Sequence, residues 1–251
     1  MPSMYFFSER PCSALLFALL LAAAFPASAQ KPRQLTARQV RKAQEDTRVT
    51  GELAESLLAA NRMLDRQERG LARLTRLIDD LLDVSRIREG KLELHLEPCD
   101  LLSLVRDRLE EQRQLNPKRT LRLSVVPANM DAIPLVADAD RIGQVVTNYL
   151  TNALKYSPAD QPVRAVVARE AAAVRVSVYD EGPGLPPAEQ ARIWEPFHRA
   201  KGIEVMTGSG VGLGLGLHIS KTLIERHGGE VGIESAPGHG STFWFTLPLP
   251  E

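Results

Sequence analysis

Polar side chains suited to nucleotide chemistry lie at three places in the second half of this 251-residue chain. The first place is the sequence NYLTNALKY, which contains Asn148, Asn152 and Lys155. On a helix these three side chains share one face, because residues three and four apart are neighbours. An amide oxygen is a hard ligand that suits Mg²⁺, and an ammonium group can pair with a phosphate. Taken alone, the segment is also compatible with a solvated polar face.

The second place is the sequence DEGPG at the expected end of a strand. Its aspartate is Asp180, and a carboxylate there can accept a hydrogen bond from an amine such as that of adenine. Gly182 and Gly184 allow the backbone to approach a ligand closely. The alternative for this segment alone is an ordinary Asp-Gly turn.

The third place is the glycine-rich run GSGVGLGLGL at residues 208–217. Alternate glycines that lead into a helix can present backbone N–H groups to a phosphate. The run lacks a surrounding βαβ unit, and no Gly-Lys-Ser/Thr follows it, which excludes the dinucleotide-binding and Walker types of glycine loop.

The elements that must position these residues follow from the periodicity of apolar residues. We expect helices at about residues 52–89, 100–115, 138–156 and 212–226. We expect strands at about residues 92–96, 119–126, 162–169, 174–179, 230–235 and 241–248. Runs of strands with helices on one side predict an α/β two-layer sandwich.

The first expected helix carries a heptad repeat of apolar residues: Leu57, Leu64, Leu71 and Ile78. Such a narrow stripe favours packing against another helix in a dimeric bundle. Packing onto the helix's own domain is the alternative. Gly70 is a weak point within this helix, and Gly90 is expected to end it.

In this order and spacing the three motifs resemble the ATP-binding catalytic domain of bacterial sensor histidine kinases, whose GHKL-type fold also occurs in DNA gyrase. Residues 148–156 resemble the asparagine box of that family, and residues 180–184 and 208–217 resemble its two glycine boxes. The sequence WEPFHR at residues 194–199 resembles its phenylalanine box. The sequence LIDDLLDVSRI at residues 77–87 resembles the second helix of the dimerisation and phosphotransfer domain.

The resemblance implies a role for each matched residue. Asn152 is expected to coordinate the Mg²⁺ that bridges the phosphates of ATP, with Asn148 supporting the site. Lys155 is expected to contact phosphate, Tyr156 to line the pocket and Asp180 to bind the adenine amine. The glycine boxes are expected to contact the nucleotide through Gly182, Gly184, Gly208, Gly210, Val211, Gly212, Leu213 and Gly214.

Asn148 separates the classes within this superfamily. Members that hydrolyse ATP or phosphorylate serine have a glutamate at this position, which serves as general base, and an amide cannot take a proton. The sequence therefore favours phosphoryl transfer to histidine. A response regulator and a second kinase chain, in a homodimer or a mixed dimer, are the implied partners.

The family's acceptor histidine lies in a motif similar to H-E-[LM]-[RK]-T-P, some 40 to 60 residues before Leu77. That window contains no histidine, and the five histidines of the chain are His95, His198, His218, His227 and His239. We expect none of them to be the acceptor, so self-phosphorylation is doubtful. A non-catalytic ATP-binding module that regulates a partner kinase is the alternative function.

Residues 13–29 form an uncharged apolar run. Three interpretations remain open: a start that is frameshifted, truncated or recombined, an inner-membrane anchor with the catalytic domain in the cytoplasm, and a secretory signal peptide. We divide the chain into residues 1–30, a partial dimerisation region at 31–91 and the catalytic domain at 92–251. Equal numbers of basic and acidic residues, 31 each, argue against a nucleic-acid partner, and two cysteines exclude a disulfide scaffold.

Overall fold

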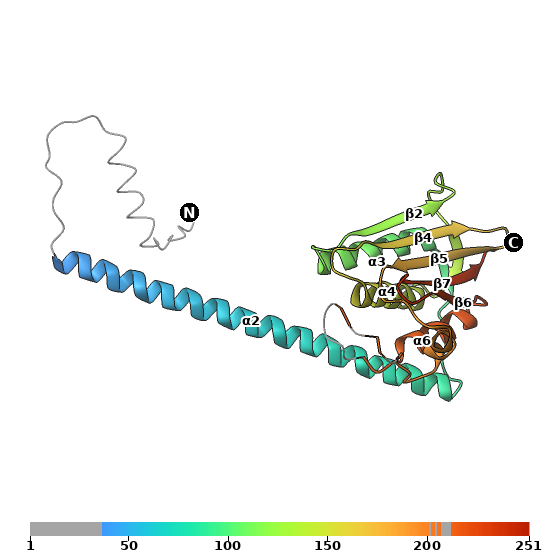
Figure 1. Ribbon diagram of the computed structural model, residues 1–251, viewed down its shortest axis with the longest axis horizontal. Coiled ribbons are helices and arrows are strands. Elements are labelled where there is room, and N and C mark those ends of the chain that lie inside the picture. Colours follow the sequence, from blue (N-terminus) through green and yellow to red (C-terminus); the bar gives the residue numbers. More distant parts are fainter. Residues whose placement is uncertain (1–36, 201, 204, 207–211, 251) are drawn as a thin grey trace, which may run out of the picture. The chain divides into compact units, whose positions relative to one another are not determined.

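The computed structural model describes residues 37–200, 202–203, 205–206 and 212–250 (Figure 1). The chain divides into two compact units, residues 1–73 and residues 74–251. The apolar run at residues 13–29 lies outside the described residues. Within the described part of the chain, no helix combines the length and the apolar character needed to cross a membrane.

Helix α2 (Ala37–Arg88) is the first described element, and it begins well before residue 52, where we expected it to start. It continues through Gly70 and ends just before Gly90, which has a positive φ of 69° that suits a glycine. The heptad residues Leu57, Leu64 and Leu71 are between 55 and 69% exposed. The apolar stripe predicted from the sequence is therefore solvent-exposed in the single chain.

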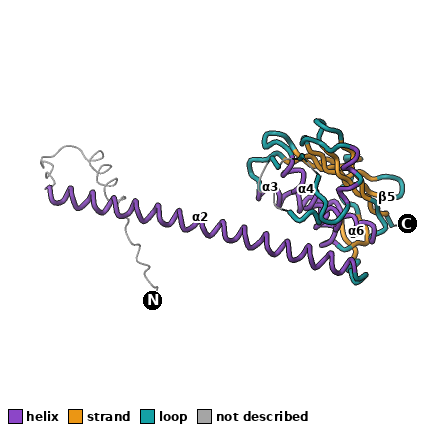
Figure 2. Tube along the Cα trace, turned by 60° about the horizontal axis from the view of Figure 1, so that its bottom comes forward, coloured by secondary structure: helices purple, strands orange, loops and turns teal. Residues whose placement is uncertain are grey.

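The second unit is a two-layer α/β sandwich, as predicted (Figures 1 and 2). Its main sheet has the strand order β2-β4-β5-β7-β6, in which β2 and β4 are parallel and the other neighbours antiparallel. The strands are β2 (Leu121–Val126), β4 (Val163–Arg169), β5 (Ala173–Asp180), β6 (Val231–Ser235) and β7 (Ser241–Pro248). A separate antiparallel pair joins β1 (Glu97–Asp100) to β3 (Pro134–Ala137).

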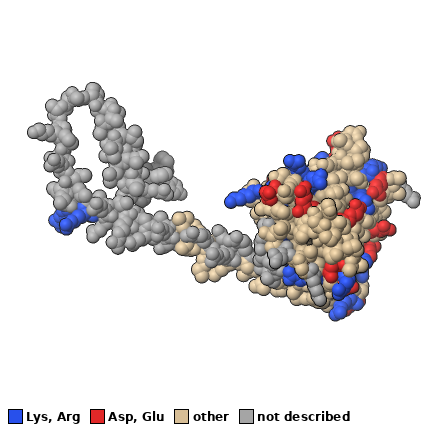
Figure 3. Space-filling view, viewed as in Figure 1, with Lys and Arg blue, Asp and Glu red and all other residues tan. Residues whose placement is uncertain are grey.

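Helices lie against one face of the main sheet, and the ribbon views show them as a separate layer. The helices are α3 (Leu101–Leu115), α4 (Ala139–Tyr156) and α6 (Gly216–Arg226). Two short elements, α5 (Pro187–Gln190) and the 3₁₀ helix η1 (Arg192–Trp194), follow β5. Figure 3 shows basic and acidic side chains interspersed on the visible face of residues 74–251.

The core forms where the inner face of the sheet meets the helices. Alternate residues of β5 and β7 point inward and are almost completely buried, as the period of two requires. The ring of Tyr149 on α4 packs 5.7 Å from that of Phe243 and 6.0 Å from that of Phe245. These contacts place α4 directly on the strand that neighbours β5.

Two predicted elements need correction. Residues 91–96 form no strand, although Leu92 is buried; β1 begins only at Glu97. Side chains supply partners to this segment, because Asp138 accepts from the N–H of His95 and Arg226 donates to the carbonyl of Leu92. Helix α6 begins at Gly216 rather than near residue 212. Strand β3 was not predicted.

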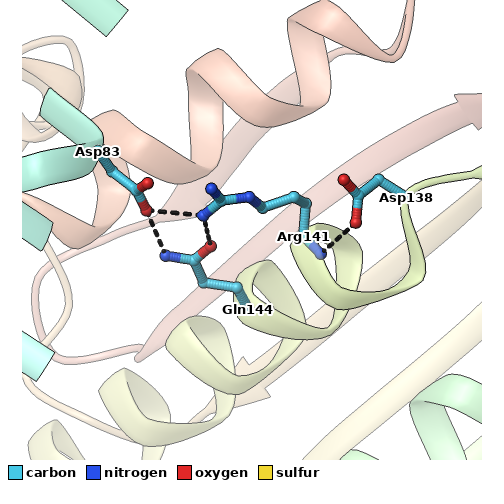
Figure 4. A network of polar contacts seen from close by, with 4 residues as sticks. All are labelled: Asp83, Asp138, Arg141 and Gln144. Atoms are coloured by element: carbon cyan, nitrogen blue, oxygen red, sulfur yellow. Dashed lines mark hydrogen bonds and ion pairs between the residues drawn. The ribbon is translucent and has the colours of Figure 1, made fainter. Parts of the chain in front are cut away.

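A network of polar contacts joins the end of α2 to the first turns of α4 (Figure 4). Asp83 is 4% exposed, and its carboxylate accepts from Arg141 at 2.8 Å and from Gln144 at 3.1 Å. Arg141 also donates to the amide oxygen of Gln144 at 3.0 Å. Asp138 caps α4 by accepting from the N–H of Arg141. The start of α4 is therefore held by side chains that satisfy one another.

Candidate functional site

The two asparagines of the predicted site lie on α4, one turn apart, and face α6. Asn148 donates from Nδ2 to the hydroxyl of Ser220 at 3.0 Å. Asn152 donates from Nδ2 to the Oδ1 of Asn148 at 3.5 Å. No described residue donates a hydrogen bond to the Oδ1 of Asn152, so this oxygen is available to a ligand.

Lys155 lies one turn beyond Asn152, near the end of α4. Its ammonium group is 4.9 Å from the centre of the Tyr156 ring. A side-chain carbon added to Gly212 would lie 3.9 Å from the same ammonium group. The lysine of the first motif and a glycine of the third are therefore neighbours in space.

Asp180 ends strand β5, where it pairs with Ser241 of β7. Its side chain is buried, and its Oδ1 accepts from the N–H of Gly182 at 2.8 Å. Burial raises the pKa of this carboxyl group to about 6, and hydrogen bonds from the backbone of Gly182 and Ser241 oppose that rise. At neutral pH this group is therefore mostly ionised and can accept a hydrogen bond. It takes up a proton when the pH falls below neutral.

The two glycines that follow Asp180 are required because neighbouring atoms lie too close to their Cα atoms to leave room for a side chain. A side-chain carbon on Gly182 would lie 2.7 Å from both the Oδ1 of Asp180 and the carbonyl oxygen of Tyr156. Gly184 has a φ of 67°, and a side-chain carbon there would lie 1.9 Å from the carbonyl oxygen of Ala236. The ends of α4 and β5 thus meet without side chains between them, which brings Tyr156 close to Asp180.

The third motif is described only from Gly212 onward; Gly208, Gly210 and Val211 lie outside the described residues. Gly214 has a φ of 71°, and its carbonyl oxygen accepts from the N–H of Phe197 at 3.0 Å. Leu213 is exposed. These residues lead into the first turn of α6, whose unpaired N–H groups favour an anion.

Sequence reasoning missed two residues of this site. Ser241 lies beside Asp180 only because β5 and β7 pair antiparallel, and the sequence contains no signal for that register. Ser220 faces Asn148, and its place four residues after Gly216 marks it as a residue of the same helix face. A side-chain carbon on Gly216 would lie 2.5 Å from the Oδ1 of Asn148, so Gly216 also shapes the site.

Together these groups suit a ligand with an amine, several phosphates and a divalent cation. Asp180 offers an acceptor to the amine, Lys155 and the start of α6 offer positive charge to phosphates, and Asn152 offers a neutral oxygen to a cation. The three motifs lie far apart in sequence, and the fold brings them to one end of α4.

Residues 137–251 match the family model described as "Histidine kinase-, DNA gyrase B-, and HSP90-like ATPase". The chain contains a histidine kinase-type ATP-binding catalytic domain. It resembles the adaptive-response sensory kinase SasA of Rippkaea orientalis, with 34% identity over 207 residues that cover 82% of this chain and 50% of the relative. It also resembles the alginate biosynthesis sensor protein KinB of Pseudomonas aeruginosa, with 36% identity over 181 residues that cover 71% of this chain and 29% of the relative.

Solved structures agree with this assignment to the histidine kinase family. The mycobacterial sensor histidine kinase MprB matches with a TM-score of 0.53 and 27% identity, over 62% of this chain and 98% of that one. Full-length ShkA in complex with AMPPNP matches with a TM-score of 0.58 and 28% identity, over 86% of this chain and 40% of that one. The chain spans half or less of the length of the two curated relatives.

Proposed function

We propose that this chain binds ATP with Mg²⁺ in the domain formed by residues 92–251 and transfers the γ-phosphoryl group to a histidine of a two-component phosphorelay. The observation that carries this proposal is the amide side chain of Asn148, one helical turn before Asn152 and hydrogen-bonded to it. An amide cannot act as the general base that water or serine needs as nucleophile. The unprotonated nitrogen of a neutral imidazole carries no hydrogen, so it can attack phosphorus without first losing a proton and needs less help from a base than water or serine.

Each group of the site has a part in this reaction. Bound Mg²⁺ would neutralise charge on the phosphates during transfer, and the free Oδ1 of Asn152 is the oxygen that fits it. Lys155 would hold the phosphates by charge. Asp180 would orient the base by accepting from the amine of adenine. Gly212 and Gly214 would allow the backbone to approach the phosphates.

We propose that the accepting histidine belongs to another chain. Three of the five histidines have hydrogen-bond partners inside the catalytic domain. His198 contacts Glu189 at 2.8 Å, His218 contacts the carbonyl of Trp194 at 3.2 Å, and His227 contacts Asp138 at 3.0 Å. None of the five lies in a sequence similar to the acceptor motif. Transfer in trans would then require a mixed dimer with a full-length kinase.

The exposed stripe of α2 supports such an assembly. Leu74, Ile78, Leu81 and Leu82 are each at least 47% exposed on the last part of the helix. Apolar residues at heptad spacing are stabilised when a second helix covers them. A response regulator would receive the phosphoryl group from the histidine, and the catalytic domain would work in the cytoplasm, where ATP is available.

Labelling with γ-³²P-ATP tests the proposal. The purified chain alone should bind Mg·ATP and acquire almost no acid-labile phosphate. Adding a histidine-bearing sensor kinase whose own ATP site is disabled should produce acid-labile phosphate on that partner. Strong self-labelling of this chain on histidine would overturn the claim about the acceptor, and absence of ATP binding would overturn the proposed function.

The alternative is a regulatory module whose effect on a partner kinase needs no catalysis. This regulatory function is favoured by one observation, that the sequence contains no acceptor motif. The substitutions Asn152→Asp and Asp180→Asn separate the two functions. If both variants still regulate the partner while neither supports phosphoryl transfer, the regulatory role is the correct one.

A further inference from the structure

The main sheet has a second face, opposite the helix layer, on which no described helix lies (Figures 1 and 2). Side chains of β5 alternate between the two faces, so the buried Asp180 points to the helix layer and Tyr179 points to the open face. A hollow of about 680 Å³ lies on the open face, beside the turn between β6 and β7. No residue of α4 or α6 lines this hollow, so it is distinct from the nucleotide site.

Five side chains in register form a row across the open face, one from each strand of the sheet. The pairing of the strands places Arg122 of β2 beside Arg164 of β4, and Arg164 beside Tyr179 of β5. Tyr179 lies beside Thr242 of β7, which lies beside Glu234 of β6. The row is therefore basic at one end, acidic at the other end and uncharged between them.

The basic end of the row lacks a counter-charge. Two like charges side by side on neighbouring strands repel each other. Arg122 and Arg164 form no ion pair with a described residue, and the guanidinium of Arg164 lies 5.5 Å from the centre of the Tyr179 ring. An anionic group placed over the two arginines would offset their repulsion.

The acidic end of the row is available to a cation. Glu181, which follows β5 and lines the hollow, is exposed and forms no ion pair with a described residue. The Oε1 of Glu234 lies 3.9 Å from the Nη1 of Arg175, but the Glu234 side chain is 70% exposed, so this ion pair contributes little. A basic group bound at this end of the hollow would meet two carboxylates.

The distance between the two ends selects the shape of the ligand. Three strand spacings separate Arg164 from Glu234, which places their Cα atoms about 14 Å apart. In an extended chain, two residues four positions apart are about 13 Å apart and point to the same side. On a helix the same two residues rise by only about 6 Å. An extended segment with its charges four positions apart therefore matches the row.

We propose that the open face of the sheet binds an extended segment of a partner protein that carries an acidic and a basic side chain four positions apart. The acidic side chain lies over Arg122 and Arg164. The basic side chain lies between Glu181 and Glu234, and the residue midway between the two charges packs on Tyr179 in the hollow. This binding does not depend on the proposed phosphoryl transfer.

Titration of the ¹⁵N-labelled chain with a capped peptide of sequence TETVTKT tests this assignment. The peptide carries glutamate and lysine four positions apart, and it should shift the amide signals of Tyr179 and Thr242. The peptide TTEKVTT has the same composition but adjacent charges, so it can use only one end of the row. It should bind about two- to fivefold more weakly. Equal affinities for the two peptides would overturn the assignment.

Two charge reversals test the ends of the row separately. Arg164→Glu and Glu234→Lys should each weaken binding of TETVTKT about three- to tenfold, because each replaces an attraction by a repulsion. Arg106→Glu is the matched control: Arg106 is an exposed residue of α3, in the helix layer, and its reversal changes the net charge as Arg164→Glu does. This control should bind the peptide like the unaltered chain.

The remaining outcomes contradict the assignment in different ways. If TETVTKT shifts no signal of the open face, or if Arg106→Glu weakens it as much as Arg164→Glu does, the row selects no such segment. A second copy of this chain is the other candidate occupant. If Arg164→Glu lowers the mass of the chain in analytical ultracentrifugation while the unaltered chain binds no peptide, the open face joins two copies and the proposed partner is wrong.

Discussion

The two halves of helix α4 use polar side chains in opposite ways. In the first half, Asp138, Arg141 and Gln144 are satisfied by other protein groups, including the buried Asp83 of α2. In the second half, the Oδ1 of Asn152 and the ammonium of Lys155 have no hydrogen-bond partner among the described residues. One half holds the helix in place, and the other half is left available to a ligand.

This difference shows how a single helix can be both rigid and reactive. Gln144 and Asn148 are four residues apart, so the anchored residues and the asparagines follow one another on the same face. Substitutions in the first half should change stability and leave nucleotide affinity alone. Substitutions of the ligand-facing groups should do the reverse.

Removing the anchor of α4 should have the largest effect. Asp83→Ala leaves the guanidinium of Arg141 in a mostly buried place without its carboxylate, and should lower the free energy of unfolding by about 3 kcal/mol. Chemical denaturation measures it. Glu89→Ala is the control, because Glu89 forms an exposed ion pair with Lys91 and should change the free energy by at most about 0.5 kcal/mol. Equal losses in both variants would contradict the assigned role of Asp83.

Asp180→Asn should have the next largest effect, and on binding. Loss of a charged acceptor for the adenine amine should weaken ATP about 10- to 100-fold. GTP should lose far less, since its base has a carbonyl in place of that amine. Titration with both nucleotides measures the ratio. Equal losses for ATP and GTP would show that Asp180 does not read the base.

The pKa of Asp180 predicts a smaller, pH-dependent effect. Its pKa of about 6 lies above the ordinary value of 3.8, so the group is ionised at pH 7 and takes up a proton as the pH falls through 6. Because the protonated group is a poorer acceptor, ATP affinity should fall about tenfold between pH 7 and pH 5. Asp180→Asn should lack this component, and the titration of the nucleotide's own phosphates is common to both proteins. If ATP affinity depended on pH in the same way in the unaltered chain and in Asp180→Asn, Asp180 would not be the group that titrates.

The smallest effect concerns α2, where no ligand group is involved. Gly70 lies within the helix, and a side-chain carbon there meets nothing within 4 Å. Gly70→Ala should therefore stabilise the helix by about 0.5–1 kcal/mol and leave ATP affinity unchanged. Thermal unfolding followed by circular dichroism measures the change. A loss of stability would indicate that the position is in contact with another helix.

Much of the fold could be predicted because local rules decide it. The sequence predicts helices that begin near residues 100 and 138, and in the structure Asp100 and Asp138 cap them. Strands β2, β4, β5, β6 and β7 lie within a few residues of the predicted bounds. The strands show a strong period of apolar residues, and the two helices have polar residues that cap them. Neither signal depends on residues far away in the sequence.

The wrong predictions concern segments whose secondary structure depends on contacts with residues far away in the sequence. Residues 92–96 alternate like a strand, but the side chains of Asp138, which caps α4, and of Arg226 in α6 take the place of a neighbouring strand. Strand β3 exists because it pairs with β1, and it is too short to show a period. Helix α6 begins only at Gly216, because Gly214, two residues earlier, has a φ of 71° that a helix cannot contain.

The amino-acid sequence by itself determined the three motifs, the class of ligand they suit and the two-layer architecture, because residue type and short spacing carry that information. Only the tertiary structure decided which groups meet. It placed Ser241 beside Asp180 through the register of β5 and β7, and Ser220 against Asn148 through the packing of α6 on α4. Such contacts join residues about 60 to 70 positions apart, and no local rule of spacing or hydropathy encodes them.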